Sequence, residues 1–167
     1  IWTIDEVKLF LTNTEGDRFF CAYALALYTG MRMGEILGLR WSDVHLAKKI
    51  IKINQTLVNY GKQLKRGAKT TSSSREISIP QQLVSILIQQ KERHERFLKS
   101  KHMLPSIEDL VIFNYKNGRH IFPTNLSSSF VRAVERSGLP KITFHSLRHT
   151  HATLLLEHNM NIKLISA

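Results

Sequence analysis

The sequence predicts a mainly α-helical fold with a small antiparallel β-sheet, that is, an α+β domain. Most segments repeat apolar residues at the spacing of a helix, whereas residues 49–58 and 75–80 alternate apolar and polar residues as strands do. The chain has 167 residues, of which 43% are hydrophobic. This length is sufficient for one domain with its own core and too short to expect two.

Three helices are expected in the first part of the chain. Thr3 and Glu6 have the spacing of a capping box, so a helix should begin directly after Thr3. A second, strongly apolar helix is expected over residues 17–28, and Gly30 follows it as a natural C-terminal cap. A short third helix is expected at residues 33–37.

The predicted sheet follows these helices. Ile51 and Ile53 alternate with polar residues within 49–58, which indicates a strand. Residues 61–74 are rich in Gly, Lys, Thr and Ser and are expected to form a turn region, and a second strand is expected at 75–80.

Helices dominate the second half of the prediction. Thr143 is a suitable N-cap for the helix that contains His145 and Arg148. The expected elements are helices at 80–99, 123–136, 145–158 and from 161 onward, and a brief strand at 110–113.

The charge of the chain favours a polyanionic partner. Its 24 lysine and arginine residues outweigh 13 aspartate and glutamate residues, which gives a formal net charge of +11 and a pI near 10.0. A merely solvated basic surface is the alternative. A membrane-surface role is disfavoured, because the basic residues are scattered along the chain rather than gathered on one amphipathic helix.

The single cysteine, Cys21, excludes an intrachain disulfide and fits an intracellular setting. It lies in an apolar run at residues 19–28, so a buried thiol is expected there rather than a nucleophile. That run is too short to span a bilayer, and no membrane partner is expected.

Two arginines and a histidine point to phosphate chemistry. His145 and Arg148 are three residues apart near a helix start, so they can reach one small anion together. Arg32 lies beside a turn far upstream, with Glu35 close enough to orient it. The alternatives are a surface Arg–Glu pair and a solvated helix start. His149 is expected to form a hydrogen bond inside the fold.

A metal site is the competing interpretation of the histidines. His145 and His149 have the i, i+4 spacing of a zinc-binding helix, with His151 and His158 nearby. However, Ser146 stands where the HExxH motif has glutamate, and no Cys or Asp cluster completes a tetrahedral set. No metal is therefore expected.

Three motifs, taken in order, resemble those of the tyrosine recombinases, the phage integrase family. They are Thr-Gly-x-Arg-x-x-Glu at 29–35, Lys-Thr-x-x-Ser-x-Arg at 69–75 and His-x-Leu-Arg-His-Thr at 145–150. The resemblance covers almost the whole chain and concerns the catalytic domain of that family. It implies the fold of that domain over residues 1–167 and double-stranded DNA as the partner.

The resemblance also implies a role for each site residue. Arg32 and Arg148 would clamp the scissile phosphate and stabilise the pentacoordinate transition state. Lys69 would be the general acid for the departing 5′-hydroxyl, although its position alone is equally that of a solubilising loop lysine. His145 would hydrogen-bond the phosphate and assist proton transfer. A tyrosine would form a 3′-phosphotyrosyl link, with no metal or nucleotide cofactor.

The nucleophile is the departure from the family pattern. The family places its tyrosine several helical turns after the His-x-x-Arg motif, and no tyrosine follows Arg148 here. All four tyrosines precede it: Tyr23, Tyr28, Tyr60 and Tyr115. We therefore expect a chain that is truncated at its C-terminus, lacks the N-terminal core-binding domain, and cannot cleave DNA alone.

The leading hypothesis is a phage or mobile-element integrase that performs site-specific recombination as a tetramer on DNA, with this fragment a monomer in solution. Three alternatives belong to other classes: a non-catalytic DNA-binding module, a metal-dependent hydrolase and a purely structural domain. Together, Arg32, Lys69, His145 and Arg148 favour the enzyme, because simple phosphate contacts would not require the histidine.

Overall fold

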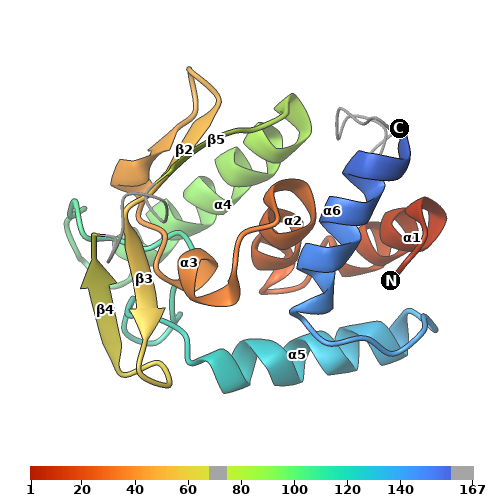
Figure 1. Ribbon diagram of the computed structural model, residues 1–167. Helices are drawn as coiled ribbons and strands as arrows, with labels where there is room; N and C mark the ends of the chain where they lie inside the picture. Colours follow the sequence, from red (N-terminus) through yellow and green to blue (C-terminus); the bar gives the residue numbers. More distant parts are fainter. Residues whose placement is uncertain (68–74, 159–167) are drawn as a thin grey trace.

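The computed structural model describes residues 1–67 and 75–158. In this part of the chain, six α-helices pack together, and two small antiparallel sheets lie at one side of them (Figure 1). The helices are α1 (Ile4–Thr14), α2 (Phe20–Thr29), α3 (Met33–Leu37), α4 (Gln81–Ser100), α5 (Pro123–Arg136) and α6 (Ser146–His158), with a 3-10 turn η1 at Trp41–Asp43. None of the described helices is long and apolar enough to cross a membrane.

The predicted helices are confirmed with small changes at their ends. The capping box of α1 is present in both directions between Thr3 and Glu6. Gly30 ends α2 with a φ of 69°, a left-handed conformation that glycine adopts without a steric penalty. Thr143 exchanges hydrogen bonds with Ser146 at the start of α6, as an N-cap should. The helix expected from 161 onward lies outside the described residues.

Helix α2 is the centre of the core. Nine of its ten residues are buried, and it packs against α1, α3, α4 and α6, so these four helices share its surface (Figure 1). Cys21 is among the buried residues, and burial raises the pKa of its thiol to about 12, with nearby Arg93 opposing this effect. Such a thiol is protonated at neutral pH, which confirms the core role expected for it.

The β structure differs from the prediction of one sheet. Strands β2 (Ile50–Ile53) and β3 (Gln55–Val58) follow one another with a break at Asn54, and each has its own partner. Strand β4 (Gln63–Arg66) pairs with β3, whereas β5 (Arg75–Ser78) pairs with β2, whose other edge carries β1 (Val44–His45). Strands β4 and β5, which run back along β3 and β2, therefore belong to two different sheets.

Two local expectations were wrong. Residues 61–74 were expected to be turn throughout, yet β4 occupies 63–66; all four of its residues are exposed, so no hydrophobic alternation marked the strand. Residues 110–113 form no strand beyond a single bridge from Leu110 to Arg40. That run is apolar because it is buried in the core, and the Val111 carbonyl accepts a hydrogen bond from Gln90 of α4 rather than from a neighbouring strand.

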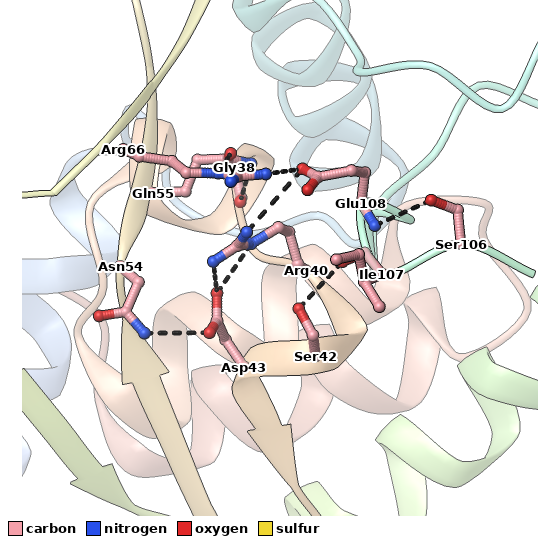
Figure 2. Close-up of polar contacts among 10 residues, drawn as sticks. All are labelled: Gly38, Arg40, Ser42, Asp43, Asn54, Gln55, Arg66, Ser106, Ile107 and Glu108. Carbon is pink, nitrogen blue, oxygen red and sulfur yellow. Dashed lines mark hydrogen bonds and ion pairs between the residues drawn. The ribbon is translucent and has the colours of Figure 1, made fainter.

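A polar network holds β4 in place (Figure 2). Arg40 pairs with Asp43 at 2.9 Å and lies 3.8 Å from Glu108, while Arg66 of β4 pairs with the same glutamate. Asn54, at the break between β2 and β3, donates to Asp43 at 3.0 Å. These contacts tie the last residue of β4 to η1 and to the loop before Leu110.

Glycines allow α3 to approach β3 closely. A β-carbon at Gly34 would lie 2.7 Å from the Leu57 carbonyl oxygen, and one at Gly38 would lie 2.9 Å from that of Gln55. Gln55 in turn donates to the Gly38 carbonyl at 3.0 Å. Because the contacts are with backbone atoms, a side chain at either position would push the helix and the strand apart.

We predict that Gly34→Ala destabilises the fold by about 1–3 kcal/mol, because the added methyl group overpacks this contact. Helix propensity alone would give the opposite sign, a gain of up to about 1 kcal/mol. Chemical denaturation of both proteins measures the difference. Gly16→Ala is the matched control, since a β-carbon there meets nothing within 4 Å. A stabilised Gly34→Ala protein would contradict the close approach.

Candidate functional site

Arg32 lies at the junction of α2 and α3. The turn before it is shaped by the left-handed Gly30 and by Thr29, whose hydroxyl accepts a hydrogen bond from the Met31 N–H at 3.1 Å. Arg32 itself is the N-cap of α3, and its side chain is 59% exposed. The turn therefore fixes the backbone of Arg32 and leaves its guanidinium accessible to a ligand.

Glu35 is the buried anion of this region, with a side chain only 5% exposed. Arg75 binds it with both nitrogens of its fork, Nη1 to Oε2 at 2.8 Å and Nη2 to Oε1 at 3.0 Å. The backbone N–H of Arg32 donates to Oε1 at 2.9 Å. Burial alone would raise the pKa of Glu35, but the hydrogen bonds from Arg75 and Arg32 outweigh it and the pKa is lowered.

The expected Arg32–Glu35 pairing is thus mainly a backbone contact, and the Arg32 guanidinium lies 3.8 Å away. Sequence reasoning quoted Arg75 within a motif but assigned it no role. The available signal was a glutamate inside the apolar run 33–37, which requires a cationic partner. The partner is 40 residues away in the chain, so spacing could not identify it.

Arg148 is brought to the same place by α6, which packs directly on α2. His151, one turn further along, fixes this contact: its Nδ1 lies 2.7 Å from the Leu27 carbonyl oxygen. The pKa of Arg148 is lowered by burial and then by the positive charges of Arg32 and Arg75, with Glu35 opposing them. The structure therefore assembles Arg32, Arg75 and Arg148 within electrostatic reach of one another.

One nitrogen of this cluster lacks a partner. Nη1 of Arg148 is buried and has no hydrogen-bond acceptor among the residues that the structure describes. A buried donor left without an acceptor is costly, and in native proteins it usually indicates a ligand or an ordered water. Three guanidinium groups against a single carboxylate leave a net positive charge, which suits a tetrahedral phosphate.

His145 lies on the turn that leads into α6. Its carbonyl accepts the Arg148 N–H at 3.1 Å, and its exposed ring lies 5.1 Å from that of His149. His149 is exposed as well, so the expectation that it forms a hydrogen bond inside the fold was wrong. His151 has that role instead, because it is one of the α6 residues that face α2.

The remaining candidates are placed as follows. Lys69 lies outside the described residues. No group of three His, Cys, Asp or Glu side chains that could hold a metal ion occurs in residues 1–67 or 75–158. Tyr23 and Tyr28 are buried in α2, Tyr60 is in the turn between β3 and β4, and Tyr115 is in a loop against Phe113.

Comparison with known proteins identifies the family. The family model described as the phage integrase family matches residues 3–167. The chain belongs to the phage integrase family. A XerC-like tyrosine recombinase of Caldanaerobacter subterraneus is 29% identical over 97% of this chain, and the integrase of Staphylococcus phage L54a is 35% identical over 82% of it. These alignments cover 44% and 40% of the two relatives, so the chain spans less than half the length of either one.

Solved structures of a transposon integrase and a recombinase share this fold. The Tn1549 transposon integrase, in complex with circular intermediate DNA, superposes with a TM-score of 0.70 at 26% identity over 93% of this chain and 54% of that protein. The XerA recombinase gives 0.70 at 22% identity over 98% of this chain and 53% of its own. The mainly helical tyrosine-recombinase fold with small antiparallel sheets is thereby confirmed.

The His151 contact predicts a pH dependence of stability. Burial lowers the pKa of His151, its hydrogen bond to Leu27 opposes the shift, and nearby Arg148 lowers the pKa further. Because the pKa in the folded state is below the unfolded value of about 6.5, this contribution is complete above about pH 6.5 and is lost as the pH falls through the folded-state pKa.

We therefore expect the free energy of unfolding to fall less steeply for His151→Asn than for the parent protein as the pH is lowered from about 7 to about 5. Asparagine places an amide nitrogen where Nδ1 of His151 lies, so it can donate to Leu27 without titrating. Urea denaturation at several pH values measures both slopes. Identical slopes would show that His151 does not carry the pH dependence.

Proposed function

We propose that this chain is the catalytic domain of an integrase that performs site-specific DNA recombination through a 3′-phosphotyrosyl intermediate. The observation that carries this proposal is the buried, unpartnered Nη1 of Arg148 beside Arg32, within the described part of a phage integrase family member. The net charge of +11 suits a DNA partner. The relatives named above, a recombinase and a phage integrase, support the same reaction class.

The reaction assigns one task to each side chain. Arg32 and Arg148 hold the non-bridging oxygens of the scissile phosphate and stabilise the charge that accumulates in the pentacoordinate transition state. A tyrosine oxygen attacks phosphorus, the bond to the 5′-oxygen breaks, and Lys69 protonates that oxygen. His145 hydrogen-bonds the phosphate and assists proton transfer.

The other parts of the proposal concern the whole protein. The nucleophile is a tyrosine other than the four described above. The intact protein acts as a tetramer on double-stranded DNA in the bacterial cytoplasm, and residues 1–167 alone are monomeric. The chemistry uses the side chains already named, with no metal or nucleotide cofactor.

The decisive experiment uses the complete gene product that contains this chain and a nicked duplex bearing its recombination site. With chelator present, a covalent protein–DNA adduct that survives SDS is expected, and mass spectrometry should locate it on a tyrosine. DNA binding without an adduct would favour the non-catalytic binding module. Strand cleavage without an adduct, seen only when a divalent metal replaces the chelator, would favour the hydrolase.

In this assay Arg148→Ala should reduce adduct formation by at least about a hundredfold, because a guanidinium that stabilises transition-state charge contributes on the order of 3 kcal/mol. The variant should remain folded, which circular dichroism checks. Arg132→Ala is the control, since it removes the same charge from an exposed position on α5 and should match the parent protein in adduct formation. Unchanged cleavage by Arg148→Ala would remove Arg148 from the mechanism.

Lys69→Ala tests the general acid. It should slow adduct formation on ordinary DNA, because the 5′-oxygen then leaves without a proton. A substrate with sulfur at the 5′-bridging position has a better leaving group and should restore the rate. The same substrate should not restore Arg148→Ala. Failure of the sulfur substrate to rescue Lys69→Ala would exclude this role.

A further inference from the structure

Glu35 lies next to two arginines, yet it accepts side-chain hydrogen bonds from only one of them, Arg75. Both of its oxygens accept hydrogen bonds from Arg75, at 2.8 and 3.0 Å, and Oε1 also accepts the backbone N–H of Arg32. The guanidinium of Arg32 is 3.8 Å from Oε2, beyond hydrogen-bond distance. Both carboxylate oxygens therefore have hydrogen-bond donors without the Arg32 side chain.

The position of Arg75 is set by the sheet and needs no ligand. Arg75 is the first residue of β5 and pairs with Ile53 of β2. Its fork reaches Glu35 in α3 across the gap between sheet and helix, and the hydrogen bond to Glu35 raises its pKa. The Arg75–Glu35 pair is thus formed in advance, on two elements held by their own backbone contacts.

Without Arg75, the nearest cation to Glu35 would be Arg32. The two residues are three apart at the start of α3, a spacing that brings side chains together. A buried carboxylate without a counter-ion is strongly unfavourable, so Glu35 would draw the Arg32 guanidinium about 1 Å inward to pair with it. Arg32 would then be less available to a phosphate.

We propose that Arg75 is a positioning residue of the phosphate site, which occupies Glu35 so that the Arg32 guanidinium stays free for the phosphodiester. The inference rests on the proposed function, since it assumes a DNA phosphate beside Arg32 and Arg148. Arg75 acts through Glu35 and Arg32 and need not touch the DNA.

The role of Arg75 can be tested without the nucleophilic tyrosine, by measuring how DNA binding by the 167-residue chain depends on salt. The affinity for a short random-sequence duplex is measured over a series of NaCl concentrations, and the logarithmic slope counts phosphate contacts. Arg32→Ala and Arg75→Met should each lower the slope by about one, with affinity reduced about fivefold. Arg136→Met is the matched control: it breaks an exposed Arg–Asp pair with Asp17, which precedes α2 at the opposite end from Arg32, and should leave the slope unchanged.

The distinguishing variant is the double substitution Glu35→Gln with Arg75→Met. The introduced glutamine still offers an oxygen to the Arg32 backbone N–H but has no charge to capture its guanidinium. The double variant should therefore recover the parent slope, whereas a merely structural role predicts further loss. Thermal unfolding confirms that each variant is folded. Should Arg75→Met not fold, Arg75→Lys replaces it, because an ammonium lacks the fork that holds both oxygens.

The two proposals fail in different ways. If the parent chain shows no salt-dependent DNA binding, the proposed function fails. If the parent binds but Arg75→Met keeps its slope, Arg75 has no positioning role. If the double variant does not recover the slope that Arg75→Met loses, whether it equals that variant or falls further, the loss comes from general loosening and the inference is overturned.

Discussion

The burial of α2 is the constraint on which the rest of the structure depends. The C-terminal end of α2 leads through a turn to Arg32, and α6, which carries Arg148, packs against the side of α2. These two arginines are 116 positions apart in the chain (148 − 32). They meet because one apolar helix must be covered on all sides. The contact between His151 and the Leu27 carbonyl then fixes α6 along α2. The geometry of the site is therefore a product of core packing rather than of local motifs.

The site also opposes its own stability. Arg32, Arg75 and Arg148 repel one another, Glu35 compensates for only part of that charge, and a donor of Arg148 stays unsatisfied within the described residues. Sites that bind reacting anions commonly accept such a cost, which the ligand relieves on binding. A site with no net charge would be more stable and would bind a phosphate less well.

Sequence patterns predicted the parts of the fold whose causes are local. The capping box at Thr3, the glycine after α2 and the N-cap at Thr143 each marked a helix end, and the three motifs identified Arg32, His145 and Arg148 as candidates. What escaped prediction depends on distant partners. Strand β4 is exposed and owes its place to β3 and to the pair between Arg66 and Glu108, and the role of Arg75 follows only from its proximity to Glu35.

Strands β4 and β5 belong to different sheets, so the fold sets the register of each strand separately. Arg66 pairs opposite Gln55 and Arg75 opposite Ile53, so the ladder is complete on both sides of the residues between them. Because each register is set by its own partner strand, a slip of the exposed strand β4 against β3 need not move Arg75 from its place opposite Ile53.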